Sequence, residues 1–203
     1  MERYLMTHSL LSSWLYSLKE NPFEDATSER DSYAEFLSTL NREPSLPNEA
    51  MQKGIDFENL VTDIADGKGD ASHRWYEAAG KVAHTLRGAK FQFRTRREFM
   101  VGDLSLLFYG RLDALEAGKI YDIKYSGKYD VGKFYDSTQH PFYFALVPEA
   151  TEFRYLVSDG TDVWTETYFR ENTRSIIPTV KDFLEWLKVY DLMHVYKEKW
   201  LAL

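Results

Sequence analysis

Two acidic side chains and a lysine lie close together in mid-sequence, on two segments with the alternating pattern of β-strands. Asp113 belongs to the run Gly-Arg-Leu-Asp-Ala-Leu, and Asp122 and Lys124 belong to the later run Tyr-Asp-Ile-Lys-Tyr. Because strand side chains alternate between two faces, Asp122 and Lys124 should share one face and Ile123 should point to the other. A short connection through Gly118 should pair the segments as a hairpin and bring Asp113 beside Asp122.

Two neighbouring carboxylates repel each other unless a positive charge neutralises them. Mg²⁺ or Mn²⁺ would do so, and the Ile123 carbonyl between Asp122 and Lys124 is a further candidate oxygen ligand. Such an ion polarises a phosphodiester and lowers the pKa of a bound water, while Lys124 orients that water or neutralises charge on the phosphate. The same spacing also occurs on solvated sheet faces, so the spacing alone leaves a purely structural role open.

The order of further motifs resembles the RecB-like branch of the PD-(D/E)xK nuclease superfamily, which includes phage-type exonucleases. Gln139 and Tyr143, which follow the two strand motifs, match the Gln-xxx-Tyr pattern of that branch. The branch also has an acidic residue on a helix upstream of the strands, often in a Gly-xx-Phe-Glu-like context. The run Gly-Ile-Asp-Phe-Glu, which ends at Glu58, matches this motif. The run Ser-Leu-Leu-Ser-Ser-Trp at 9–14 resembles its opening helix, so the similarity covers most of the chain.

The resemblance implies metal-binding and catalytic roles for four side chains and one carbonyl: Glu58, Asp113, Asp122, Lys124 and Ile123. The three carboxylates and the carbonyl would hold Mg²⁺ or Mn²⁺, and the lysine would assist the attacking water. Gln139 and Tyr143 would lie one helical turn apart on one face, toward the site or the substrate backbone. The implied activity is that of a metal-dependent deoxyribonuclease, and an exonuclease of DNA recombination, repair or phage DNA processing is favoured.

Other interpretations stay open at this stage. Glu58 and Gln139 have structural alternatives as surface residues, and Tyr143 as a core aromatic. The substrate could be RNA, and the fold could be a weakly active or inactive module that binds nucleic acid or a protein. The sequence is also compatible with a partner, which could be a recombination protein, a helicase or a second copy of the chain.

The composition of the chain argues against some functions and kinds of site. The net charge of -7 disfavours indiscriminate nucleic-acid binding, although the arginines at 94, 96 and 97 and several lysines form local basic groups. Those groups are equally compatible with a solvated face. The absence of cysteine excludes thiolate zinc sites, iron–sulfur clusters and the cluster-bearing members of the RecB-like branch. No P-loop motif is present, so unwinding driven by ATP would need a partner.

Apolar periodicity predicts the elements that position these residues. Helices are predicted at 8–19, 27–40, 48–65, 70–86, 129–146 and 176–200, and strands at 90–101, 104–115, 119–125, 152–157 and 163–169. We therefore expect one α/β (α+β) domain over 1–203, with helices to about 87 and a sheet-containing core from about 88. Its core should be restriction-endonuclease-like, with a mixed central sheet flanked by helices and an N-terminal helical extension. No apolar run is long enough for a membrane span and no signal peptide is evident, so a cytoplasmic location is expected.

Overall fold

The structure of the chain is a computed structural model that describes residues 2–19 and 31–202. The chain divides into two compact units. Unit 1 comprises Met1–Ser45, Thr95–Gly110 and Ser175–Leu203, and unit 2 comprises Leu46–Arg94 and Arg111–Arg174. All the residues with predicted chemistry lie in unit 2, and the prediction of one domain over the whole chain stays a prediction.

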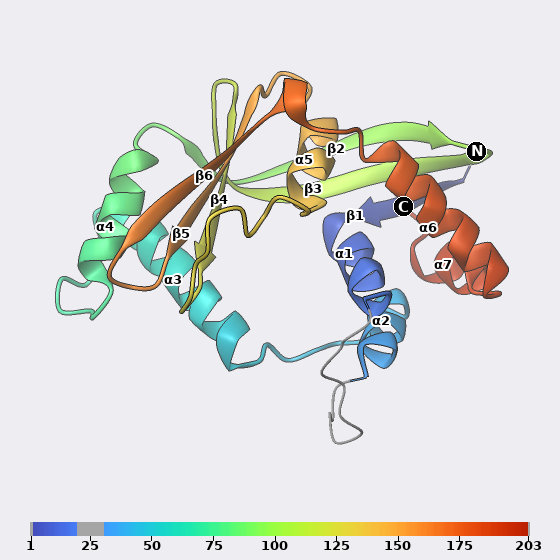
Figure 1. Cartoon of the computed structure of the whole chain (residues 1–203), viewed down its shortest axis with the longest axis horizontal. Coiled ribbons are helices and arrows are strands. Elements are labelled where there is room, and N and C mark those ends of the chain that lie inside the picture. Colours follow the sequence, from blue (N-terminus) through green and yellow to red (C-terminus); the bar gives the residue numbers. More distant parts are fainter. Residues whose placement is uncertain (1, 20–30, 203) are drawn as a thin grey trace. The chain divides into compact units, whose positions relative to one another are not determined.

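The described residues contain one mixed sheet of six strands (Figure 1). The strands are β1 (Arg3–Thr7), β2 (Lys90–Val101), β3 (Leu104–Glu116), β4 (Lys119–Tyr125), β5 (Glu152–Ser158) and β6 (Val163–Phe169). Their hydrogen-bonded order is β1-β3-β4-β5-β6, and β2 also pairs with β3. The pairs β1–β3 and β4–β5 are parallel, whereas β3–β4 and β5–β6 are antiparallel. The predicted α/β fold, a mixed sheet flanked by helices with further helices in the N-terminal part, is confirmed.

Unit 2 places helices against both faces of its part of the sheet. Its elements besides strands are α3 (Glu49–Ala65), α4 (Tyr76–Thr85), α5 (Gln139–Leu146) and the short 3-10 helix η1 (Arg170–Asn172). One core contains Phe57 of α3 and Val82 of α4 together with Ile123 of β4. Because Asp122 alternates with Ile123, it points to the opposite face, where α5 lies.

Local sequence explains how two of these elements begin and turn. The Asn48 side chain accepts a hydrogen bond from Met51 N at 2.9 Å, which caps the start of α3. Between β5 and β6 the chain turns through Gly160, whose φ is 99°. A Cβ at Gly160 would lie 2.4 Å from the Trp75 ring, so both the backbone conformation and the close packing require glycine there.

The described part of unit 1 contains β1, parts of β2 and β3, and four helices: α1 (His8–Ser17), α2 (Ser32–Leu40), α6 (Ile177–Val189) and α7 (Met193–Lys199). Thr7 ends β1 and caps α1 by accepting a hydrogen bond from Leu10 N. Aromatic side chains fill this unit, since Trp14 and Phe36 both contact the ring of Phe183. The start of the second helix predicted at Thr27 lies outside the described residues.

Three predicted elements differ from the observed ones. The helix predicted at 70–86 begins only at Tyr76, because Asp70 accepts bonds from Ser72 in a local turn that precedes it. The helix predicted at 129–146 begins only at Gln139. The single helix predicted at 176–200 is two helices, α6 and α7, with Asp191 between them at a φ of 55°.

One strand was not predicted at all. Strand β1 pairs in parallel with β3 over the register Arg3↔Ser105 to Thr7↔Tyr109. Its burial alternates, with Tyr4 and Met6 inward, but five residues near the chain start give too short a pattern to stand out. Among the helices of the described segments, none is both long and apolar enough to cross a membrane.

Candidate active site

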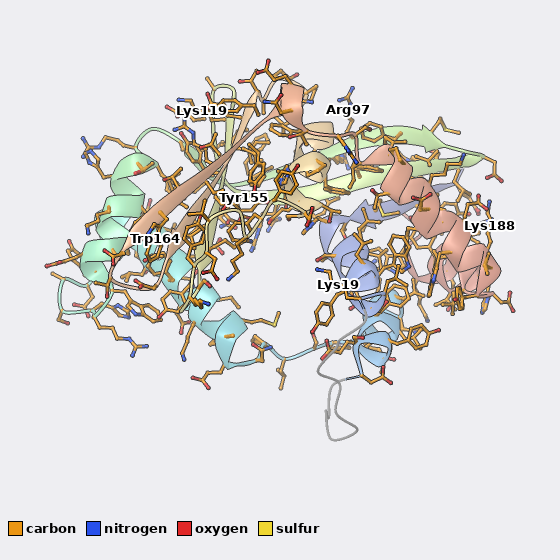
Figure 2. All side chains as sticks on the ribbon, in the orientation of Figure 1. Lys19, Arg97, Lys119, Tyr155, Trp164 and Lys188 are labelled. Atoms are coloured by element: carbon orange, nitrogen blue, oxygen red, sulfur yellow. The ribbon has the colours of Figure 1, made fainter. Side chains whose placement is uncertain are left out.

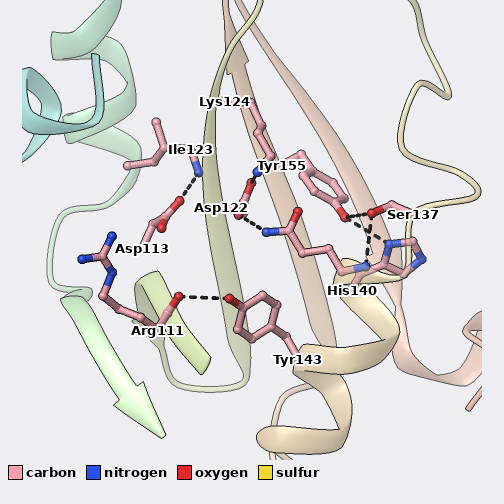
Figure 3. A network of polar contacts seen from close by, with 10 residues as sticks. Arg111, Asp113, Asp122, Ile123, Lys124, Ser137, His140, Tyr143 and Tyr155 are labelled. Carbon is pink, nitrogen blue, oxygen red and sulfur yellow. Dashed lines mark hydrogen bonds and ion pairs between the residues drawn. The ribbon is translucent and has the colours of Figure 1, made fainter. Parts of the chain in front are cut away.

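The antiparallel pairing of β3 with β4 extends from the hairpin turn as far as Ala114, so Asp113 is the first residue of β3 beyond it. Its paired positions are Ala114↔Tyr121, Leu115↔Ile120 and Glu116↔Lys119. Beyond them, the Oδ2 atom of Asp113 accepts a hydrogen bond from the Ile123 backbone N–H at 2.8 Å (Figure 3). The carboxylate thus replaces the missing carbonyl partner of that N–H, and this holds Asp113 at the point where the strands separate.

Asp122 is the most enclosed carboxylate of the site, with only 5% of its surface exposed. Its Oδ2 lies 2.8 Å from Nζ of Lys124, and its Oδ1 accepts a hydrogen bond from the side chain of Gln139 on α5. Oδ2 forms an ion pair with Lys124 but has no hydrogen-bond partner among the described residues. The predicted placement of Asp122 and Lys124 on one face of β4 is confirmed by this contact.

Helix α5 is fixed against the sheet by contacts on both sides of Gln139. Tyr143, one turn further on, donates from its hydroxyl to the Arg111 carbonyl of β3 at 3.1 Å (Figure 3). The Ser137 hydroxyl accepts from Gln139 N at 3.1 Å and from the Tyr155 hydroxyl at 3.3 Å. Tyr155 itself is fully buried and lies within the body of unit 2 (Figure 2). The amide of Gln139 therefore reaches Asp122 from a rigid support.

Glu58 approaches the site from α3 while Phe57 beside it enters the core. Its Oε1 accepts a hydrogen bond from the Gln92 side chain of β2. Gln92 has a φ of 52°, a conformation that non-glycine residues seldom adopt in strands. Asp56 is exposed and accepts instead from Gln52 at 2.7 Å, whereas the charge of Glu58 acts on Asp113 and Lys124.

The three carboxylates act on one another electrostatically. Burial raises the pKa of Asp113 well above its usual value, and the charges of Asp122 and Glu58 raise it further. The Ile123 N–H and Lys124 only partly oppose this shift. Burial alone would lower the pKa of Lys124, but the ion pair with Asp122 and the nearby charges of Asp113 and Glu58 raise it overall. Three carboxylates thus share one ammonium group, and the site has a deficit of positive charge.

This deficit of positive charge around Asp113 and Asp122 suits a divalent cation with hard oxygen ligands. Asp113 and Asp122 would hold it, with Glu58 the nearest further carboxylate. As the side chains stand, no three His, Cys, Asp or Glu side chains of residues 2–19 and 31–202 form a group that could hold a metal ion.

Two supports of the site had no signal in the sequence. Gln92 sits in an alternating strand pattern, and its contact with Glu58 depends on how β2 bends. Ser137 falls within the helix predicted at 129–146 and Tyr155 within the strand predicted at 152–157, and neither pattern indicates that they hold the start of α5. The three arginines of β2 at 94, 96 and 97 are all exposed, and the Arg97 guanidinium lies over the Phe99 ring.

His140 lies beside Gln139 and is buried for structural reasons. Its Nδ1 is 3.2 Å from the Tyr155 hydroxyl, and its ring stacks on Tyr168 at 4.1 Å. Burial lowers the pKa of His140 to about 4, and the charge of Glu166 opposes this only in part. In the folded protein the His140 ring is therefore neutral at neutral pH.

We expect a pH-dependent stability from this histidine. The pKa of His140 is lower in the folded protein than the value of about 6.5 expected in the unfolded chain. The contribution of His140 to the free energy of unfolding is therefore fully present above pH ~6.5 and is lost as the pH falls toward about 4. Urea unfolding from about pH 7 to 4.5 should show a slope that His140→Phe reduces by up to about 1.4 kcal/mol per pH unit. Equal slopes for the two proteins would contradict this assignment.

Comparisons with known proteins bear on the fold. No protein-family model matches the chain, and no curated protein matches it. Among solved structures, one reported as the crystal structure of SSO0001 is similar, with a TM-score of 0.54 and 14% sequence identity. The match covers 94% of this chain and 78% of that one. At this identity the likeness shows that the two chains share a fold.

Proposed function

We propose that this chain is a metal-dependent nuclease of the PD-(D/E)xK type that hydrolyses phosphodiester bonds of DNA. The observation that carries the proposal is Asp113 beside the Asp122–Lys124 pair, where the two strands separate. Two carboxylates and an ammonium at one point, with too little positive charge among them, suit a divalent cation and a phosphate group. The order of the motifs along the chain supports the same class.

The residues of the site have separable tasks in such a hydrolysis. Bound Mg²⁺ or Mn²⁺ would supply charge that polarises the phosphodiester and lowers the pKa of the attacking water. Lys124 stays protonated at neutral pH because its pKa is raised. It therefore serves as a cation that orients water and stabilises charge on the phosphate, rather than as a base. Asp113 and Asp122 hold their positions through the Ile123 N–H and the Gln139 amide.

Gln139 and Tyr143 act in this proposal chiefly through other groups. Gln139 is 9% exposed and its amide is bonded to Asp122, while the Tyr143 hydroxyl is bonded to the Arg111 carbonyl. Both contacts fix α5 relative to β3 and β4. They are positioning residues for the carboxylates, and any contact with the substrate backbone is secondary.

The decisive experiment is degradation of linear DNA by the purified full chain, followed as release of acid-soluble nucleotides. We expect activity with Mg²⁺ or Mn²⁺ and none with EDTA. The double variant Asp113→Ala, Asp122→Ala should lose it, whereas Asp56→Ala, an exposed carboxylate near Glu58, should not. Activity that survives the double change would refute the proposal.

The rival proposal is a nuclease-fold module that binds nucleic acid or protein without cleaving. The bonds that engage Asp113 and Glu58 with Ile123 N and Gln92 are what favour it. Calorimetric titration separates the two proposals. Binding of Mg²⁺ or Mn²⁺ that disappears in the double variant supports the nuclease, and no binding at millimolar concentration supports the module.

A further inference from the structure

Arg111 lies on β3 two residues before Asp113, in the stretch that precedes the pairing of β3 with β4 at Ala114. Side chains alternate along a strand, and Leu112 between the two is only 2% exposed, whereas Arg111 is exposed. Arg111 and Asp113 therefore project from the same face of β3. Two such side chains leave a strand about 7 Å apart, which places the arginine next to the carboxylate site.

The backbone of Arg111 is held by the same helix that holds Asp122. The Tyr143 hydroxyl donates to the Arg111 carbonyl at 3.1 Å, and Gln139, one turn earlier on α5, donates to Asp122 (Figure 3). The arginine and the carboxylate are thus fixed relative to each other through one helix. Less conformational entropy is lost on binding when a side chain starts from a backbone that is already fixed.

The guanidinium of Arg111 forms no hydrogen bond, ion pair or contact with an aromatic ring within the part of the chain that the structure describes. The three carboxylates of the site accept hydrogen bonds from a backbone N–H and two amides rather than from this arginine. The cations of unit 2 that do pair with carboxylates are Lys53, Lys68, Lys119, Lys124, Lys128 and Arg154. Arg111 therefore keeps a positive charge beside the site that no described contact of the fold uses.

A guanidinium in this position suits a phosphate group. Its planar fork of donors matches two oxygens of one phosphate, which a lysine cannot do. Lys124 already serves the phosphate that is cut, and Arg111 begins about 7 Å further along the strand, so the neighbouring phosphate is its natural ligand. The chain has a net charge of -7, and a single local cation therefore makes a large share of the attraction to nucleic acid.

We propose that Arg111 binds the DNA phosphate next to the one that is cleaved and so positions the strand at Asp113 and Asp122. The contact is to the backbone of the nucleic acid, and it therefore carries no preference for a base sequence. This inference rests on the proposed nuclease function, because it assigns a further contact with the substrate of that same site.

Fluorescence anisotropy of the full chain with a labelled DNA oligonucleotide tests the contact. EDTA prevents cleavage, and the salt concentration is varied, because the slope of log K against log salt reports the number of phosphate contacts. Arg111→Ala should weaken binding about tenfold and reduce that slope by about one, equally for oligonucleotides of different base composition. Arg111→Gln should behave in the same way. Arg111→Lys keeps the charge, so the slope should persist while the affinity falls about threefold.

Hydrolysis in Mg²⁺ gives a second measurement. Arg111→Ala should raise KM about tenfold and leave kcat within about threefold, because a phosphate that does not react is bound equally in the ground state and the transition state. The matched control is Arg87→Ala, at an exposed arginine just after α4, which should change neither binding nor hydrolysis. Circular dichroism checks that each variant is folded.

An unchanged affinity and salt slope in Arg111→Ala and Arg111→Gln would overturn the inference. A loss of affinity that depends on base composition would also overturn it, because the arginine would then contact a base, and so would a failure of the unchanged protein to bind DNA. These results are distinguishable from failure of the proposed function. Binding that depends on Arg111 without Mg²⁺-dependent cleavage would refute the nuclease alone, and cleavage with unaltered binding and KM in Arg111→Ala would refute this contact alone.

Discussion

Asp113→Asn should make the protein more stable and at the same time nearly inactive. The asparagine oxygen can still accept the hydrogen bond from Ile123 N, so the backbone contact is preserved. The change removes one of three mutually repelling carboxylates, and the free energy of unfolding should rise by roughly 1 kcal/mol. Loss of a charged ligand for the divalent cation removes several kcal/mol of transition-state stabilisation, which corresponds to a rate loss on the order of 10³-fold.

Thermal unfolding in EDTA and DNA hydrolysis in Mg²⁺ measure the two effects separately. Asp56→Asn, on an exposed carboxylate bonded only to Gln52 among the described residues, is the matched control and should leave both quantities unchanged. A fall in the stability of Asp113→Asn would mean that the charge of Asp113 is needed for the fold rather than for chemistry. Retained activity would remove Asp113 from the metal site.

Residues close in sequence were the part of the site that could be predicted. Strand β4 has the predicted bounds, and its period of two places Asp122 and Lys124 together without any tertiary information. The position of Asp113 beside Asp122 could be predicted from the hairpin through Gly118 alone, and a hairpin is also a local signal. The start of α3, in the helix predicted at 48–65, is equally local, because Asn48 caps it through a contact with Met51 N three residues on.

Contacts between distant segments could not be predicted in this way. The bond between Glu58 and Gln92 links two elements far apart in sequence, and it depends on a positive φ at Gln92. The helical spacing of 129–138 is overridden because Tyr129 and Phe134 are bonded to Glu166 of β6. The helix break at Asp191 has neither glycine nor proline as a signal, although aspartate tolerates that conformation better than most residues.

Helix α5 depends in turn on one arginine whose role no sequence pattern indicates. Arg170 follows β6, and its guanidinium donates to the carbonyls of Phe144 at 2.7 Å, Val147 at 2.6 Å and Ala150 at 2.6 Å. The first two carbonyls lie at the carboxyl end of α5, where the helix dipole favours a cation. The guanidinium also lies 4.8 Å from the Phe144 ring centre. One side chain therefore fixes the end of the helix whose start holds Gln139.

Arg170→Met should be strongly destabilising. Methionine fills part of the volume but leaves the Phe144 and Ala150 carbonyls without the guanidinium donor and the Val147 carbonyl with the Ala150 N–H alone. Each hydrogen bond to a charged group contributes about 1.5–3 kcal/mol, not additively. We expect a loss of about 3 kcal/mol, which for a chain of this size lowers Tm by about 6–12 °C in calorimetry. DNA hydrolysis measured well below Tm should also fall severalfold, because a looser α5 holds the Gln139 amide on Asp122 less well.

Two further variants separate charge from geometry at this position. Arg170→Lys keeps the charge but cannot donate to three carbonyls in one plane, so its Tm should lie between those of Arg170→Met and the unchanged protein. Arg174→Met, at an exposed arginine four residues on, should unfold like the unchanged protein. If Arg170→Met unfolds within 2 °C of the unchanged protein, the carbonyls are satisfied by water and α5 is held by its side chains alone. In that case the position of Gln139 depends on Ser137, Tyr143 and Tyr155, and the support of the site lies entirely at the amino end and sheet-facing side of the helix.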